Sequence, residues 1–251
     1  MDHGKLSQAL ISAELTALFQ AASGSNLNWS STAADEAKRK LKAILFQEQN
    51  GRCAYCRRMI SDEPGHVEID HILPKGAHGD AGLWHSNDTG CRRATSGYPQ
   101  FTFVAHNLAL TCKRCNNKKG TYDSRSDRSL PAGNVYIFDE KYYDWVHIYT
   151  HNYYDHIQII DGLIYQIVNS SSGGEAVISV CKLDEIAAVE KSSAELKVKN
   201  ATSVAIAIGL LLSQVELAGW QFVTDAVSAK FPNISSEEIE EEIEKYRSLF
   251  K

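Results

Sequence analysis

The pattern of apolar and polar residues predicts helices near the start of the chain. Apolar residues recur at near-helical spacing over residues 6–20. The Ser- and Asn-rich stretch 21–32 predicts a loop, and Thr32 is the expected N-cap of a helix over residues 33–49. Asn50-Gly51 is a typical helix end, so this second helix leads directly to the first cysteine.

Residues 129–182 change to a pattern typical of β-structure. The stretches HIQII and LIYQIV flank Asp161-Gly162, which predicts a β-hairpin with a type I′ turn. Gly173-Gly174 precedes the apolar stretch AVISV, which we interpret as a further strand. We therefore expect a small β-rich extension here.

The last segment, residues 183–251, returns to helical spacing. We expect helices over 183–199, 202–230 and 237–250. The helix over 202–230 is so apolar that it must be buried, within this chain or against another. A capping box formed by Ser235 and Glu238 opens the last helix. That helix carries six glutamates, which indicate a solvated face, a docking surface for a basic partner, or a lid that repels DNA until it is displaced.

Composition places the chain among ordinary globular proteins. Of its 251 residues, 43% are apolar and 23% are charged, which excludes wholesale disorder, a collagen-like repeat and a coiled-coil rod. The N-terminus lacks an unbroken apolar signal segment. The apolar stretch 204–212 is well short of the roughly twenty residues that a membrane span needs. We expect a cytoplasmic protein with no membrane contact.

The charge is unevenly distributed along the chain. The net charge is −5, which alone argues weakly against a nucleic-acid partner. Residues 51–128 hold twelve basic and eight acidic residues, so this segment carries +4 and the remainder −9. Phosphate binding needs a local positive potential, which the central segment supplies.

Cysteine spacing indicates a metal site in the centre of the chain. Four of the six cysteines form two C-x-x-C pairs: Cys53, Cys56, Cys112 and Cys115. Four thiolates complete a tetrahedral zinc site with no open position, so this zinc would be structural. Because 55 residues separate the pairs, a folded segment must lie between them. The competing interpretation is four buried cysteines without a ligand.

Further polar residues between and after the two cysteine pairs suggest a catalytic site. Asp70 and His71 stand where a predicted strand ends before Pro74. A carboxylate is a hard ligand for Mg²⁺ or Mn²⁺, and an imidazole serves as a general base near neutral pH. Asn116 follows the last cysteine of the second pair, from which its side chain can reach a metal at Asp70. Basic residues suited to nucleic-acid binding are Arg92, Arg93, Lys113, Arg114, Lys118 and Lys119.

The stretch 53–120 resembles the HNH endonuclease family, the zinc-supported branch of the ββα-metal nucleases. The order C-x-x-C, D-H-I-x-P and N-L-x-L-x-C-x-x-C-N-x-x-K-G matches the family pattern throughout. The resemblance implies that Asp70 and Asn116 bind a catalytic Mg²⁺ or Mn²⁺ and that His71 activates water as general base. It also implies that Asn107 orients the His71 loop and that the four cysteines hold structural Zn²⁺. The expected substrate is DNA.

The implied fold is α+β, with an HNH core at residues 51–128. N-terminal helices (1–50) precede the core, and a β-rich extension (129–182) and a C-terminal helical region (183–251) follow it.

Two departures from the family pattern stand out. Asn116 occupies a position that is often histidine, and its carbonyl oxygen favours a hard metal such as Mg²⁺ or Mn²⁺. The segment between His71 and Asn107 is long and resembles an insertion. Its His78, His85 and Cys91 could be taken for a second metal site, although we interpret them as exposed loop residues.

More loosely, the chain resembles HNH nucleases of bacterial defence systems of the Septu type, which work with an ATPase. Three functions therefore stay open: a metal-dependent DNA endonuclease, a zinc-stabilised nucleic-acid-binding module without catalysis, and a nuclease subunit active only with a partner. The C-terminal helices are the expected docking region for such a partner.

Overall fold

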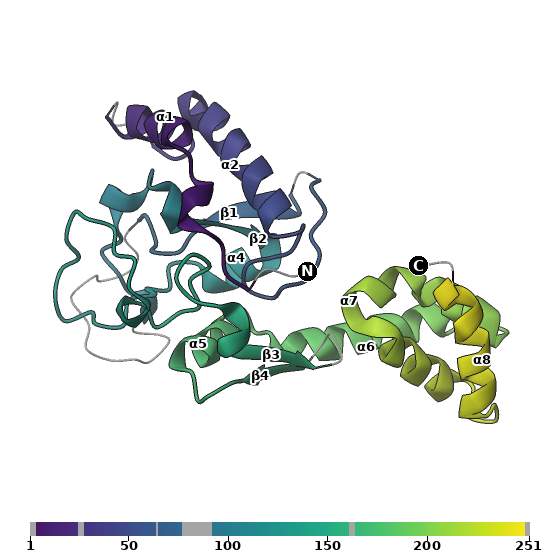
Figure 1. The fold of residues 1–251 in the computed structure, drawn as a ribbon. Helices are drawn as coiled ribbons and strands as arrows, with labels where there is room; N and C mark the ends of the chain where they lie inside the picture. Colours follow the sequence, from purple (N-terminus) through teal and green to yellow (C-terminus); the bar gives the residue numbers. More distant parts are fainter. Residues whose placement is uncertain (1–3, 25–27, 64, 77–91, 161–163, 249–251) are drawn as a thin grey trace. The chain divides into compact units, whose positions relative to one another are not determined.

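The computed structural model describes residues 4–24, 28–63, 65–76, 92–160 and 164–248 (Figure 1). The chain divides into two compact units. The first comprises Met1–Gln158 and Ile167–Lys182, and the second comprises Ile159–Gln166 and Leu183–Lys251.

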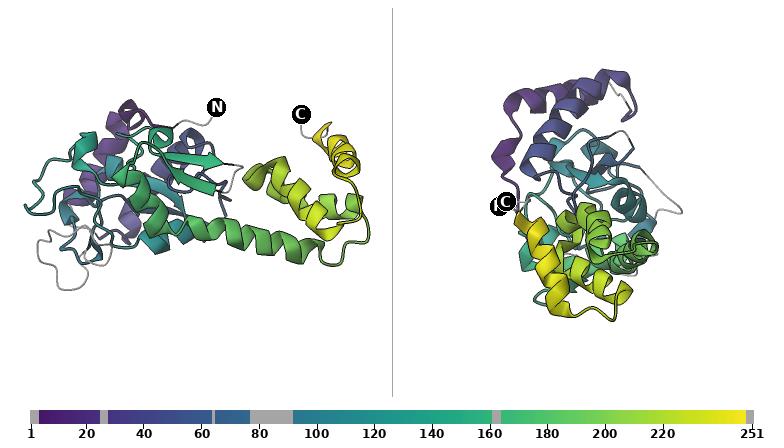
Figure 2. Two further views of the ribbon diagram at one scale, coloured as in Figure 1. Left: turned by 90° about the horizontal axis from the view of Figure 1, so that it is seen from below. Right: turned by 90° about the vertical axis from the view of Figure 1, so that its right-hand side faces the viewer.

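Two helices open the first unit, α1 (Ala13–Gly24) and α2 (Asp35–Glu48), and they pack against each other (Figures 1 and 2). Short 3-10 turns, Gln8–Leu10 and Thr32–Ala34, precede them. The first helix therefore begins later than the apolar spacing predicts. The cap assignment at Thr32 was also wrong, because Thr32 lies inside the 3-10 turn that the Ser31 hydroxyl caps, and α2 begins only at Asp35.

The centre of the first unit is a ββα arrangement. Strands β1 (Val67–His71) and β2 (Leu108–Cys112) are antiparallel, with Val67 opposite Cys112 and His71 opposite Leu108. Helix α4 (Lys113–Lys119) starts immediately after β2 and packs against both strands, while α2 also contacts β2. Buried apolar side chains of β2 hold these elements together, and they include Leu108 and Leu110. Residues 72–107 separate the two strands along the chain.

The predicted β-hairpin is present as β3 (Ile157–Ile160) and β4 (Ile164–Ile167). Its turn at Asp161-Gly162 lies outside the described residues.

The strand expected at AVISV was wrong, because these residues belong to helix α5 (Ser172–Cys181). Ser171 caps this helix by accepting a hydrogen bond from Gly174 N at 3.0 Å. A Cβ atom at Gly174 would lie only 2.4 Å from the carbonyl oxygen of His156. The two glycines therefore allow close packing of a helix, although they resemble a turn signal in the sequence.

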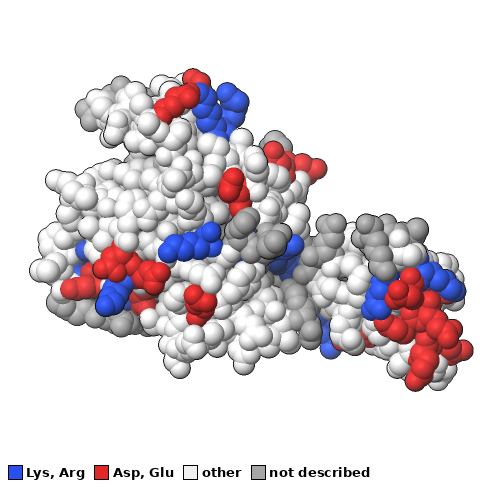
Figure 3. All heavy atoms as spheres, in the orientation of Figure 1, with Lys and Arg blue, Asp and Glu red and all other residues white. Residues whose placement is uncertain are grey.

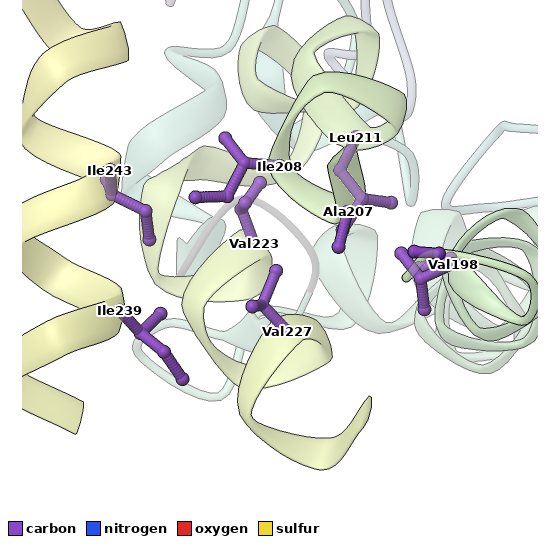
Figure 4. Packing of buried hydrophobic residues seen from close by; sticks show 10 residues of the cluster. Val198, Ala207, Ile208, Leu211, Val223, Val227, Ile239 and Ile243 are labelled. Carbon is purple, nitrogen blue, oxygen red and sulfur yellow. The ribbon is translucent and has the colours of Figure 1, made fainter. Parts of the chain in front are cut away.

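The second unit contains part of the β3–β4 hairpin and three helices, α6 (Asp184–Val198), α7 (Val204–Lys230) and α8 (Ser236–Arg247). Apolar side chains from all three helices meet in its core (Figure 4). The expected continuous helix over 202–230 is interrupted at Gly219, whose φ of 78° and ψ of 169° are not helical. The capping box of Ser235 and Glu238 is confirmed.

Glutamates gather on the exposed face of α8 (Figure 3). Among the described helices, none is both long and apolar enough to span a membrane.

Candidate metal centre and adjoining cavity

Four cysteine side chains meet between β2, α4 and the segment before β1. The Sγ atoms of Cys53, Cys56, Cys112 and Cys115 all lie within 4.8 Å of one another. Sulfurs on a tetrahedral zinc ion stand about 3.8 Å apart, since each Zn–S bond is about 2.3 Å. The 3.9 Å separation of Cys56 Sγ and Cys112 Sγ agrees with that spacing. The residues present therefore fit a structural zinc ion.

Backbone geometry at both pairs supports this cluster. Arg57, directly after the first pair, has a left-handed φ of 57°, and its N–H donates to Cys53 O at 3.0 Å. In the second pair, Cys115 N donates to Cys112 Sγ at 3.4 Å. Donation of an N–H group to sulfur stabilises the thiolate form that binds metal. Another buried cysteine, Cys181, lies outside the cluster, with its Sγ 3.9 Å from Cys115 O.

A cavity of about 390 Å³ lies beside β1 and α4. Its lining includes Asp70, His71 and Asn116, which come from the end of β1 and the middle of α4. The β1–β2–α4 arrangement therefore brings these three predicted residues to one cavity. Lys75 and Gly120 also line it.

The imidazole of His71 is held in a defined orientation. Its Nε2 lies 3.1 Å from the backbone carbonyl oxygen of Thr102, which can only accept, so Nε2 carries the proton. Burial lowers the pKa of His71 to about 3, and the positive charge of Lys75 adds to this effect. The ring is thus neutral at pH 7, and Nδ1 carries the lone pair. Trp29 packs edge-on against the imidazole, with ring centroids 4.5 Å apart.

Asp70 is buried, and its two carboxylate oxygens have different surroundings. Oδ2 accepts a hydrogen bond from the Tyr55 hydroxyl at 2.5 Å and lies 3.1 Å from Lys119 Nζ. The contact of Oδ1 with the same ammonium is longer, at 3.5 Å. Lys119 is completely buried and also donates to the carbonyl oxygen of His71 at 2.7 Å. These contacts fix the carboxylate plane.

Asn107 connects the loop after β1 to the start of β2. Its Oδ1 accepts from Leu73 N at 2.8 Å, and its Nδ2 donates to Leu73 O at 3.0 Å and to Phe101 O at 3.2 Å. Its own carbonyl accepts from Ile72 N at 2.8 Å. This fully buried side chain therefore holds the backbone that follows His71.

The six basic residues proposed for nucleic-acid binding have different environments. Lys113 and Lys118 are exposed on α4. Arg93 donates to the carbonyl oxygens of Lys118 and Lys119.

Arg114 donates to the carbonyl oxygens of Cys181 and Lys182. Arg92 is 1% exposed and pairs with Asp144 at 2.9 Å. The burial of Arg92 and Lys119 corrects the expectation that they contact phosphate, because their charged groups face internal partners. His78, His85 and Cys91 lie outside the described residues.

Several residues at this site were missed by the sequence reasoning. The Glu68 carboxylate accepts a hydrogen bond from Asn116 Nδ2 at 2.5 Å. Its position two residues before Asp70 was the available signal, since alternate strand residues share a face. Tyr55 lies inside the first cysteine pair. Trp29 and Thr102 gave no sequence signal, because only the fold brings them to His71.

Comparisons with known proteins show a partial similarity to a curated protein and no match to a family model or a solved structure. A curated protein described as Septu protein PtuB, from Bacillus thuringiensis, is 33% identical over 105 residues. The match covers 39% of this chain and 33% of that protein, so the chain spans about a third of the relative's length. Over part of its length, the chain is therefore similar to a Septu protein.

Proposed function

We propose that this chain is a metal-dependent endonuclease of the HNH type that hydrolyses phosphodiester bonds in DNA. The observation that carries the proposal is the cavity shared by Asp70, His71 and Asn116, next to four clustered cysteines. A buried thiol cluster suits a structural zinc ion, whereas the cavity offers oxygen and imidazole ligands. In this proposal the cysteine cluster supports the fold, and the cavity is the catalytic site.

The oxygen atoms of the cavity fit a hard divalent cation. Asp70 Oδ1 makes the longer contact with Lys119, at 3.5 Å, and the amide of Asn116 presents its N–H group to Glu68. A carboxylate oxygen and an amide oxygen are the ligand types that Mg²⁺ and Mn²⁺ prefer. When bound, such an ion would stabilise the negative charge that develops on the scissile phosphate and the leaving oxygen.

His71 is suited to activate the attacking water. Its Nε2–H is committed to Thr102 O, which leaves Nδ1 as the basic nitrogen. The lone pair on Nδ1 can accept the proton of a water molecule as that water attacks phosphorus. Asn107 and Lys119 hold the backbone around this histidine. In-line attack on the side opposite the 3′ oxygen would leave 5′-phosphate and 3′-hydroxyl ends.

A second candidate is a nuclease subunit of an anti-phage defence complex that cuts only with a partner such as an ATPase. The partial similarity to a Septu protein supports this candidate. The exposed glutamates of α8 offer a surface that is complementary to a basic partner.

The experiment that tests both candidates is plasmid cleavage by the purified full-length protein. Supercoiled DNA is incubated with Mg²⁺, with Mn²⁺ or with EDTA, alone and with the products of genes adjacent to its own. We expect metal-dependent products whose ends are ligatable 5′-phosphates. Cutting by the protein alone favours the first candidate, and cutting only with an added protein favours the second. If the protein binds DNA but cuts it in none of the mixtures, both candidates fail, and the result favours a non-catalytic zinc-stabilised nucleic-acid-binding module.

A further inference from the structure

The amide of Asn116 has two chemically different ends, and only one of them can bind a cation. Oδ1 carries lone pairs, whereas the Nδ2 group is a donor that would repel a metal ion. An asparagine ligand therefore needs a neighbour that fixes which end faces the metal.

Glu68 has the geometry of such a neighbour. It lies on β1 two residues before Asp70, and the side chains of both residues reach α4, where Glu68 contacts Asn116 and Asp70 contacts Lys119. Asn116 Nδ2 donates to Glu68 Oε2 at 2.5 Å. A carboxylate only accepts hydrogen bonds, so the reverse orientation of the amide would place Oδ1 against Oε2 and would be repulsive.

Rigid elements carry both partners. Glu68 stands opposite Thr111 in the β1–β2 ladder, and Asn116 is in the middle of α4, which packs on that ladder. Of the two, Asn116 lines the cavity and Glu68 does not. Glu68 therefore acts on the ligand and is not itself positioned as one.

We propose that Glu68 is a positioning residue that orients the Asn116 amide so that Oδ1 faces a divalent cation beside Asp70. This inference rests on the proposed function, because it requires the metal site at Asp70 and Asn116. It explains how an asparagine serves at a position where the related nucleases often carry histidine.

The test measures Mn²⁺ binding to the full-length, zinc-loaded protein by electron paramagnetic resonance, without DNA. Glu68→Gln replaces a pure acceptor with a side chain that both donates and accepts, so the amide loses its preferred orientation. We expect Mn²⁺ affinity to fall by about ten-fold or more. Zinc content and the unfolding temperature serve as controls for the fold.

The matched rescue is the double variant Glu68→Gln/Asn116→Asp, which reverses the donor and the acceptor. The glutamine amide introduced at position 68 then donates to the carboxylate at position 116, which keeps its other oxygen for the cation. We expect this double variant to recover Mn²⁺ affinity to within a few-fold of the wild type. A Glu68→Gln affinity equal to wild type, or a double variant as weak as Glu68→Gln alone, would overturn the positioning role.

Asp70→Asn separates this inference from the proposed function. If the wild type binds no Mn²⁺ that Asp70→Asn removes, the metal site itself is absent and the positioning role falls with it. If the wild type binds Mn²⁺ through Asp70 but Glu68→Gln binds equally well, only the positioning role fails.

Discussion

Lys119 Nζ lies 3.1 Å from Asp70 Oδ2, and the lysine side chain is completely buried. The same ammonium donates to the backbone carbonyl of His71 at 2.7 Å. One buried cation thus fixes two consecutive residues of the cavity. Its charge also compensates a carboxylate that would otherwise be costly to bury.

Removal of that cation should therefore destabilise the first unit. We expect Lys119→Met to lower the free energy of unfolding by about 3–5 kcal/mol, because it leaves Asp70 buried and uncompensated. Urea denaturation followed by circular dichroism measures this change. The double variant Asp70→Asn/Lys119→Met should recover much of the loss, since the unpaired charge is gone. A loss below about 1 kcal/mol in the single variant would refute this role.

Loss of one cysteine ligand should remove the zinc ion. We expect Cys112→Ala to abolish stoichiometric zinc and to lower the unfolding temperature, because metal binding contributes directly to folding. Cys181→Ala is the matched control, since that thiol is buried nearby but lies outside the cluster. Zinc content is measured by elemental mass spectrometry. One zinc per chain in Cys112→Ala, or none in Cys181→Ala, would contradict the assignment of the ligands.

Buried histidines should make the fold sensitive to mild acid. Burial lowers the pKa of His147 well below 6.5, and burial together with the neighbouring His156 lowers the pKa of His151 to about 4. In the unfolded chain, both imidazoles take up a proton near pH 6.5. In the folded chain, they are still neutral at that pH. Stability is therefore full above pH 6.5 and falls as the pH is lowered towards 4, by up to about 1.4 kcal/mol per pH unit for each histidine.

The check is thermal unfolding across that pH range. His151→Gln should show a shallower loss of stability than the wild type between pH 6.5 and 4. His66→Gln is the control, since its imidazole is exposed. If the unfolding temperatures of the wild type and His151→Gln fall in parallel with pH, protonation of His151 does not cause the acid sensitivity.

The exposed lysines of α4 should contribute to DNA affinity without supporting the fold. We expect Lys113→Ala and Lys118→Ala each to weaken DNA binding and to reduce the slope of log Kd against log salt by about 1. Arg92→Ala should instead destabilise the protein, because its guanidinium is buried against Asp144. Fluorescence anisotropy at several salt concentrations measures the slopes. An unchanged slope in both lysine variants would exclude them from the DNA interface.

Local sequence signals located the cysteine cluster, because two C-x-x-C pairs leave few alternatives. They also placed Asp70 at the end of a strand and Asn116 directly after the second pair, although α4 already begins at Lys113, between the two cysteines of that pair. The contacts of Lys119 could not be predicted in this way. Its sequence position on α4 resembles that of the exposed Lys118, and only the packing of α4 on β1 distinguishes the two.

The β-propensity of AVISV was misleading for a related reason. Its valines and isoleucine favour a strand locally, but Ser171 caps a helix there, and burial of Val177 and Val180 follows helical spacing. Tertiary packing therefore determined that these residues form a helix and not a strand. Trp29 and Thr102 likewise reach His71 from sequence positions far from it.

The most direct measurement of the central claim compares plasmid cleavage by the wild type, His71→Ala and His106→Ala. Each imidazole bonds a backbone carbonyl through Nε2, to Thr102 O at 3.1 Å and Gln8 O at 3.0 Å respectively, but only His71 lines the cavity. With Mg²⁺ or Mn²⁺, and with any required partner, we expect His71→Ala to cut at least about 100-fold more slowly at unchanged zinc content. We expect His106→Ala to stay within a few-fold of the wild type. Cleavage that is undiminished in His71→Ala, or absent from the wild type in every mixture, would contradict the assignment of a nuclease with His71 as its general base.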